Sequence, residues 1–285
     1  MLRNVLPELL DELPADDRRA IQSRGNLKRV NALMGNADIM ARALLDGSRE
    51  GIPETLVELG AGDGTFLLQI ARRVAPRWNG LRAVLVDQQP LVTSQTRAQF
   101  EALSWQVEPV QADVFHWLQA PAARTADITI ANLFLHHFVE RDLSTLLREA
   151  SRQTRLFLAC EPRRSRPALA AAAMLGFIGC NGVTVHDATT SVRAGFRDHE
   201  LSAAWPSAAG WTLTEGRAGH FTHGFVARLE EGRSREAALG LRGPASEAAG
   251  AGRGAPATHG RNREAAPGMG APQVERLERG EGPRD

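Results

Sequence analysis

The sequence predicts an α/β protein whose sheet is mostly parallel. Three observations lead to this fold class. Between residues 51 and 160, short runs of β-favouring residues alternate with stretches of helical periodicity, which is typical of β-α-β units. A glycine-rich turn joins the first run to the first helix, and acidic or amide residues end the runs that follow. Right-handed crossovers are expected between the parallel strands.

Five apolar runs are the predicted strands of this region: residues 55–59, 81–87, 105–110, 127–132 and 155–160. The predicted helices between them are residues 65–74, 90–103 and 141–153, with a short turn around 116–118. An alanine-rich helix follows, then a loop at 181–190 and a helix near 196–204. Two further β-like runs, at 211–214 and 221–229, predict a hairpin with a longer loop.

The chain divides into three predicted segments. Residues 1–50 are expected to form an N-terminal helical cap, because apolar residues such as Val30, Met34, Ala37 and Leu44 recur on one helical face. Residues 51–230 hold the α/β domain. Residues 231–285 contain 11 Gly and 5 Pro but no Phe, Trp or Ile. That segment cannot bury enough apolar surface to offset its chain entropy, so a disordered tail is predicted.

Composition restricts the partners and the location of the protein. The net charge of +1 gives no strong attraction to nucleic acid or to an anionic membrane, which favours a small-molecule or protein partner.

Two cysteines cannot form a disulfide framework, and no signal peptide opens the chain, so we expect a cytoplasmic protein. The apolar stretch 168–180 is shorter than the ~20 residues of a membrane helix and predicts a buried or pocket-lining helix instead. No cluster of His, Cys or acidic residues has metal-ligand spacing, so no metal site is predicted.

The glycine-rich turn is the most informative segment. Gly60, Gly62 and Gly64 stand at alternate positions after Glu58, between the strand 55–59 and the following helix. Glycine permits unusual backbone angles, and it lets a ligand approach the backbone beside the free N–H groups of a helix start. A dinucleotide-binding turn places its third glycine three residues after the second. Thr65 stands there, which disfavours an NAD(P)-dependent oxidoreductase.

Polar residues end the next three predicted strands. Asp87 ends the second strand, Asp113 follows the third, and Asn132 ends the fourth. The carboxyl ends of the strands in an open α/β sheet border the crevice in which ligands bind. A carboxylate at such a place can accept hydrogen bonds from two neighbouring hydroxyl groups.

The spacing E-x-G-x-G-x-G from Glu58 to Gly64, followed by these three polar strand ends, resembles class I methyltransferases that use S-adenosylmethionine (SAM). The resemblance implies a Rossmann-like, seven-stranded, mostly parallel sheet with an antiparallel last strand, and SAM as the cofactor. It also implies that Asp87 takes the ribose hydroxyls, that Asp113 takes the adenine amino group, and that Asn132 lines the methionine part. The predicted cofactor residues are Glu58, Gly60, Ala61, Gly62, Gly64, Asp87, Gln88, Asp113, Val114, Asn132 and Leu133.

The fourth strand continues into Leu135-His136-His137-Phe138 and lacks the Asn-Pro-Pro-Tyr of many DNA-adenine and protein-glutamine methyltransferases. This pattern resembles small-molecule methyltransferases of natural-product and quinone pathways. There the resemblance implies a histidine at the acceptor and an acid from the end of the fifth strand, here Glu161. A histidine is a suitable base because its pKa lies near neutral pH. His136, His137 and Glu161 are the predicted catalytic residues, and His186 in the predicted loop is a further candidate base.

The predicted function is methyl transfer from SAM to a hydroxyl group of a phenolic, quinol or polyketide-like small molecule. Three alternatives stay open: a C- or N-methyltransferase of the same fold, a non-catalytic subunit that binds a protein partner, and histidines that only cap the strand end and pack beneath a pocket. The residues determine neither the acceptor nor the oligomeric state.

Overall fold

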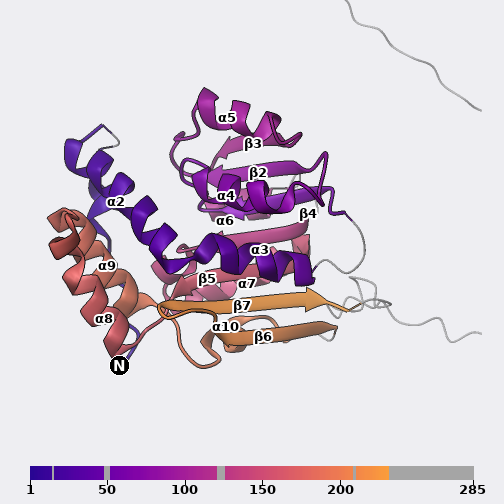
Figure 1. Ribbon diagram of the computed structural model, residues 1–285. Coiled ribbons are helices and arrows are strands. Elements are labelled where there is room, and N and C mark those ends of the chain that lie inside the picture. Colours follow the sequence, from indigo (N-terminus) through magenta and orange to yellow (C-terminus); the bar gives the residue numbers. More distant parts are fainter. Residues whose placement is uncertain (15, 48–51, 121–125, 208–209, 231–285) are drawn as a thin grey trace, which may run out of the picture. The chain divides into compact units, whose positions relative to one another are not determined.

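The computed structural model describes residues 1–14, 16–47, 52–120, 126–207 and 210–230, which all belong to one compact unit, Met1–Gly243 (Figure 1). A second unit, Pro244–Asp285, and the whole predicted tail at 231–285 lie outside the described residues.

Seven strands form one sheet in the order β3-β2-β1-β4-β5-β7-β6. Their bounds are β1 Thr55–Leu59, β2 Arg82–Asp87, β3 Gln106–Gln111, β4 Ala126–Asn132, β5 Thr154–Pro162, β6 Trp211–Arg217 and β7 Thr222–Leu229. Strands β1 to β5 pair in parallel, and β7 is antiparallel to both of its neighbours, β5 and β6. The predicted fold class is therefore confirmed.

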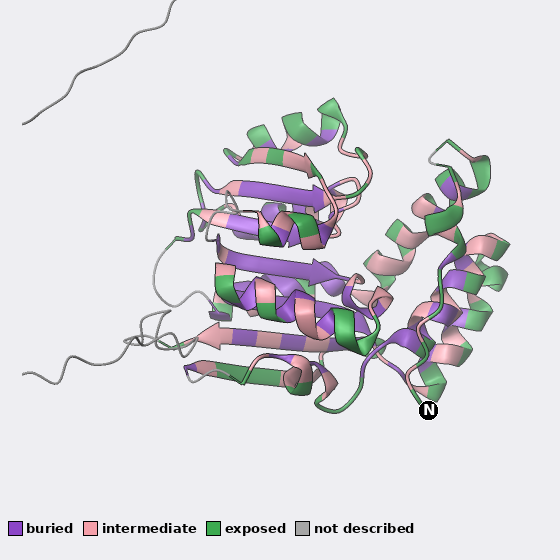
Figure 2. Ribbon diagram, turned by 180° about the vertical axis from the view of Figure 1, so that it is seen from behind, coloured by how far each residue is buried: buried purple, intermediate pink, exposed green. Residues whose placement is uncertain are grey.

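Helices cover both faces of this sheet. On one face lie α3 (Asn36–Gly47), α4 (Thr65–Val74) and α5 (Ser94–Glu101), and on the other lie α6 (Val114–Gln119), α7 (Glu140–Gln153) and α10 (Glu200–Ala204). Successive strand residues point to opposite faces, so Leu56 belongs to the first core cluster and its neighbour Val57 to the second. Figure 2 shows the buried residues concentrated along the strands and on the sheet-facing sides of the helices.

A further group of helices lies beyond the carboxyl ends of the parallel strands (Figure 1). It comprises α1 (Leu9–Glu12), α2 (Arg18–Met34), α8 (Arg166–Ala173), the 3-10 helix η2 (Met174–Ile178) and α9 (Gly182–Ala194). Helix α9 contacts α1, α2 and α8, and its Thr184 hydroxyl hydrogen-bonds to Ser23 and Asn26 of α2 (2.9 and 3.1 Å). Of the segment predicted as a cap, α1 and α2 join this group, whereas α3 packs against α4 and the sheet.

Two predicted elements are wrong. The predicted loop at 181–190 is instead the first part of α9, because the Asn181 side chain accepts the Thr184 N–H (3.0 Å) and caps the helix. The apolar stretch 168–180 is not one buried helix, since α8 ends at Ala173 and the side chains of Met174, Phe177 and Ile178 in η2 are exposed. Within the described ranges, no helix is long and apolar enough to cross a membrane.

Candidate active site

The turn after β1 leaves open space in which a ligand can approach the backbone. Gly60 and Gly62 have φ angles of 68° and 56°, which are strained for residues with a Cβ. A Cβ on Gly60 would lie 2.2 Å from the Phe134 ring, so only glycine fits against that ring. By contrast, a Cβ on Gly62 would meet no described atom within 4 Å. A side chain at Gly62 would therefore project into open space beside the start of α4.

Glu58, on β1 immediately before the turn, is buried, and no residue that the structure describes forms an ion pair with it. Its Oε2 atom makes no hydrogen bond with any residue that the structure describes. Burial raises the pKa of Glu58 well above its usual range, and the charges of Asp87 and Asp63 add to the increase. A buried carboxyl group of this kind is costly unless it is paired. The ammonium group of the methionine part of SAM is a partner of the required charge, so Glu58 and the open turn fit that cofactor.

Asp87 connects the turn to the end of β2. Its Oδ2 atom accepts the Gly62 N–H (2.8 Å) and its Oδ1 atom accepts the Gln89 N–H (2.9 Å). Each carboxylate oxygen can accept more than one hydrogen bond, so Asp87 retains acceptor capacity toward a ligand. Lys28 of α2 forms an ion pair with Asp63 in the same turn, which ties α2 to this side of the site.

Asp113, the predicted ligand after β3, has a structural role that sequence analysis did not assign. Its Oδ1 atom accepts the N–H groups of Phe115 and His116 (2.9 and 3.1 Å) and so caps α6, whose first residue is the buried Val114. Its Oδ2 atom accepts a hydrogen bond from the Gln88 side chain (3.1 Å). Residues 87–88 and 113–114 therefore lie together at the ends of β2 and β3, beside the glycine-rich turn. Ala61, within that turn, is buried.

Asn132, at the end of β4, also has a protein partner. Its Oδ1 atom accepts a hydrogen bond from the Asn36 side chain at the start of α3 (2.9 Å), a contact that no motif predicts. The next residue, Leu133, has a φ of 51°, a strained conformation for a non-glycine residue. Such strain is concentrated at functional sites, and here it turns the chain from β4 toward the two histidines.

Glu161 holds this turn in place. It is fully buried at the end of β5. Its Oε1 atom accepts the N–H groups of Phe134 and Leu135 (3.0 and 2.8 Å), and its Oε2 atom accepts hydrogen bonds from the His136 N–H and Nδ1 (3.3 and 2.7 Å). Four hydrogen bonds to one carboxylate fix the 3-10 helix η1 (Leu135–His137) and orient the imidazole of His136.

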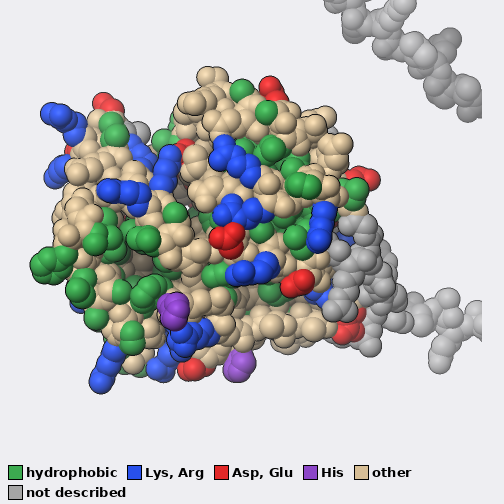
Figure 3. Space-filling model, in the orientation of Figure 1, with side chains coloured by type: hydrophobic (Ala, Val, Ile, Leu, Met, Phe, Trp, Pro, Cys, Tyr) green, Lys and Arg blue, Asp and Glu red, His purple; other side chains and the backbone are tan. Residues whose placement is uncertain are grey.

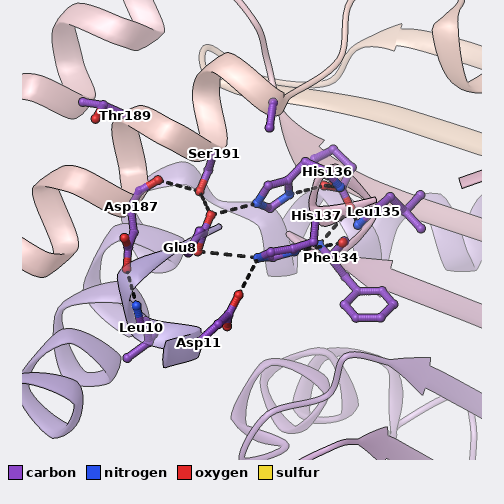
Figure 4. Close-up of polar contacts among 12 residues, drawn as sticks. Glu8, Leu10, Asp11, Phe134, Leu135, His136, His137, Asp187, Thr189 and Ser191 are labelled. Atoms are coloured by element: carbon purple, nitrogen blue, oxygen red, sulfur yellow. Dashed lines mark hydrogen bonds and ion pairs between the residues drawn. The ribbon is translucent and has the colours of Figure 1, made fainter. Parts of the chain in front are cut away.

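Glu8, from the N-terminal segment, lies on the other side of the two histidines (Figure 4). Its Oε1 atom is 3.4 Å from His136 Nε2, and its Oε2 atom is 3.5 Å from His137 Nε2. Asp11 Oδ2 lies 3.9 Å from the same His137 nitrogen. Glu8 was not among the predicted site residues, because it is 128 positions from His136 and no motif marks it.

The two buried carboxylates determine the charge of His136. Burial alone would lower its pKa, but hydrogen bonds with Glu161 and Glu8 outweigh burial and raise the pKa of His136 to about 9. Burial likewise opposes ionisation of Glu8. Hydrogen bonds and charges from His136 and His137 nevertheless hold the pKa of Glu8 well below its usual range. This cluster therefore favours a positive charge between the carboxylates.

The N-terminal segment is fixed over the histidines by two anchors. Asp187 of α9 is buried and accepts the N–H groups of Leu9 and Leu10 (2.8 and 3.0 Å) at the start of α1. Arg3 donates to the carbonyl oxygens of Ala194 and Phe138 (2.8 and 2.9 Å). Together these contacts hold Glu8 in place between α9 and η1.

His186, the remaining predicted catalytic residue, lies apart from this cluster. Its Nδ1 atom is 3.0 Å from Asp187 Oδ1, and its side chain is half exposed. Among the described residues, no hydrogen bond or ion pair joins it to His136, His137 or Glu161. The structure thus brings three of the four predicted catalytic residues together.

An open sheet of this strand order, with a glycine-rich turn after β1 and polar residues at the following strand ends, defines the class I methyltransferase fold. Residues 56–155 match a family model described as a methyltransferase domain. The match contains the glycine turn, Asp87, Asp113, Asn132 and both histidines of η1. No curated protein is significantly similar to the chain in sequence.

Solved structures support the fold assignment. An O-methyltransferase family protein from Burkholderia thailandensis is 20% identical, with a TM-score of 0.50 over 77% of this chain and 62% of that one. The plantazolicin methyltransferase BpumL in complex with S-adenosylhomocysteine (SAH) is 10% identical, with a TM-score of 0.56 over 75% and 92%. The SAM-dependent methyltransferase SibL in its apo form is 18% identical, with a TM-score of 0.52 over 80% and 63%. At these identities the likeness shows the fold, and the chain spans less than two thirds of the Burkholderia protein.

Residues 56–155 therefore form a methyltransferase domain, and the described part of the chain has the class I methyltransferase fold. The cofactor of such a domain is SAM.

Proposed function

We propose that the protein methylates a hydroxyl group of a small molecule, such as a phenol, a quinol or a polyketide-like compound, with SAM as the methyl donor. The observation that best supports this proposal is the histidine pair of η1, which follows the carboxyl end of β4. The Nε2 atoms of both histidines face the carboxylate of Glu8. The pair lies next to the cofactor turn, since the ring of Phe134 contacts Gly60. When bound, SAM supplies a methyl group carried on a positively charged sulfur.

The cofactor would be held by the turn and by the polar strand ends. The open space at Gly62 admits the ligand, Asp87 has acceptor capacity for hydroxyl groups, and Glu58 offers a carboxyl group to an ammonium group. These residues align the donor, which is the main requirement for an in-line displacement on a reactive sulfonium.

The histidine pair would act on the acceptor. A phenol, with a pKa near ~10, must lose a proton before or during transfer. Glu161 orients His136 through Nδ1, so its Nε2 atom points toward Glu8. An acceptor hydroxyl that replaces Glu8 at this nitrogen would remove one of the two carboxylates that raise the pKa of His136, so the imidazole could release its own proton and then take the proton of the acceptor.

The surface around helices α8 and α9 suits an apolar acceptor. Hydrophobic side chains gather over α8 and α9 in Figure 3, and the surface is hollowed beside them. The exposed Met174, Phe177 and Ile178 of η2 belong to this region of the chain. A substrate with an apolar ring or chain could bury that part against these helices and present its hydroxyl to the site.

The proposal can be tested by screening phenols, quinols and alkylpyrones with the purified protein and SAM. Formation of SAH is the signal, and NMR identifies the atom that is methylated.

With a competent acceptor, His136→Gln should lower kcat by roughly 10²–10⁴-fold while SAM affinity is retained. His199→Gln, at an exposed position, is the matched control. A methyl group on carbon or nitrogen would overturn the hydroxyl assignment, and a larger loss in His186→Gln than in His136→Gln would move the base to α9.

A further inference from the structure

Three side chains in the acceptor region offer ligand atoms to a single ion. One atom each of Glu8, His136 and His137 lies within 4.8 Å of the other two (Figure 4). We propose that these residues bind a divalent first-row transition-metal ion, and that Zn²⁺ best matches their two-imidazole, one-carboxylate donor set. The matched domain begins at residue 56 and so does not contain Glu8.

The distances in this cluster are long for hydrogen bonds and suitable for ligands around an ion. The two nitrogen–oxygen distances to Glu8 are 3.4 and 3.5 Å, whereas Glu161 lies 2.7 Å from His136 and Glu215 lies 2.8 Å from His223. Hydrogen bonds between charged groups are usually about 2.7–2.9 Å long. Two ligand atoms at tetrahedral positions around Zn²⁺, each about 2.0–2.2 Å from it, are roughly 3.3–3.6 Å apart. Each histidine Nε2 lies at such a distance from one oxygen of Glu8, His136 from Oε1 and His137 from Oε2.

The second ring nitrogen of each histidine has the partner that metal-bound histidines usually have. Such histidines donate the other N–H to a carboxylate or a backbone carbonyl, which directs the ligating nitrogen at the ion. Here Nδ1 of His136 is bound by Glu161 (2.7 Å), and Nδ1 of His137 donates to the Phe134 carbonyl (2.9 Å). The carboxylate of Glu8 is itself hydrogen-bonded by the Ser191 hydroxyl.

Metal binding uses the lone pairs of the Nε2 atoms, so an ion would take the place of the protons that the histidines share with Glu8 in the metal-free protein. A carbonyl oxygen can only accept, so the Nδ1 proton of His137 is directed at Phe134, and Nε2 is the nitrogen that faces Glu8 and Asp11. An ion of charge +2 at this point would bind the Nε2 lone pairs and offset the neighbouring carboxylates. Access is available, because the side chains of Asp11 and His137 are 64% and 28% exposed.

Three protein ligands leave a coordination position open, which is typical of catalytic rather than structural zinc. At this step the inference rests on the proposed function. The acceptor hydroxyl would occupy the open position, and the ion would lower the pKa of that hydroxyl as it lowers the pKa of bound water. In the metal-loaded protein, the pair would thus activate the acceptor through the ion instead of by taking the proton directly.

Metal binding can be measured without SAM or acceptor. The full-length protein is stripped with EDTA and titrated with Co²⁺ and Zn²⁺, with the visible Co²⁺ spectrum and metal content per chain as readouts. We expect one ion per chain and a Co²⁺ spectrum typical of low coordination number. Glu8→Gln and His137→Gln should each weaken Zn²⁺ binding by at least ~10-fold, and Glu161→Gln by roughly 10–100-fold through the orientation of His136. His199→Gln should bind like the wild type.

The inference is overturned if the wild type binds neither ion stoichiometrically, or if Glu8→Gln and His137→Gln bind it like the wild type. Thermal unfolding of each variant in EDTA checks that it is folded, and His137 is suited to this test because it is partly exposed. SAM titration of the same stripped sample separates the two proposals. SAM binding without metal binding overturns this inference alone, and metal binding without SAM binding overturns the proposed function alone.

Discussion

The two halves of the candidate active site are built in opposite ways. The cofactor half, comprising residues 58–64 and Asp87, is made from neighbouring positions on one turn and one contact that spans 25 residues. The acceptor half, comprising Glu8, His136, His137 and Glu161, depends on a contact that spans 128 residues, and α1 is anchored by one that spans 178. A site made of local contacts is visible in the sequence as a motif. A site made of distant contacts exists only once the chain has folded.

The largest expected effect is on the free energy of unfolding and comes from a substitution in the acceptor half. Glu161→Ala should destabilise the protein by about 3–5 kcal/mol, because it leaves buried N–H groups and a buried imidazole without their acceptor. Urea unfolding would measure the loss. Glu149→Ala, which removes ion pairs to the half-exposed Arg148 and Arg152, should cost no more than about 1 kcal/mol. Equal losses in the two variants would show that Glu161 does not organise the acceptor half.

A smaller effect is expected on the affinity for SAM, from a substitution in the cofactor half. Asp87→Asn should weaken SAM binding by about 1.5–3 kcal/mol, the value of hydrogen bonds to a charged group, and should hardly affect methionine, which lacks the ribose. Calorimetric titration with both ligands gives the comparison. Asp127→Asn is a matched control, because Asp127 also accepts two backbone N–H groups but lies at the opposite end of the strands. Similar losses for SAM and methionine would argue against ribose recognition by Asp87.

The smallest effect concerns a buried His–carboxylate pair outside both halves. Burial opposes ionisation of Glu215, but hydrogen bonds from His223 and two backbone N–H groups lower its pKa. Ionised Glu215 therefore stabilises the fold above its unfolded pKa of about 4.3, and this contribution is lost as the pH falls through the lower folded value. Glu215→Gln should flatten the acid side of a stability–pH profile and leave SAM affinity unchanged. A profile parallel to that of the wild type would show that the pair adds nothing to acid stability.

Sequence alone predicted the sheet, and it marked the candidate cofactor residues on one turn and the neighbouring strand ends, because both depend on short-range patterns. Alternating strands and helices, the glycine spacing and the polar strand ends are all legible within a few residues. The predicted loop at 181–190 failed because Asn181 followed by Gly182 is as typical of a turn as of a helix start, and the cap hydrogen bond to Thr184 decides between them. Glu8 could not be predicted, since its position follows from the contact of Arg3 with Ala194 and from that of Leu9 with Asp187, which form only in the folded chain.

The central claim is that the turn at Gly62 receives SAM, and a calorimetric comparison of two glycine variants tests it most directly. Gly62 and Gly80 both have positive φ (56° and 78°), and a Cβ on either would meet no described atom within 4 Å. Valine at either site therefore costs similar backbone strain, but only Gly62 lies in the turn, since Gly80 precedes β2 at the other end of the strands. The account predicts one SAM bound per chain for the wild type and Gly80→Val, and no measurable binding for folded Gly62→Val. Wild-type affinity in Gly62→Val, or no SAM binding by the wild type, would contradict it.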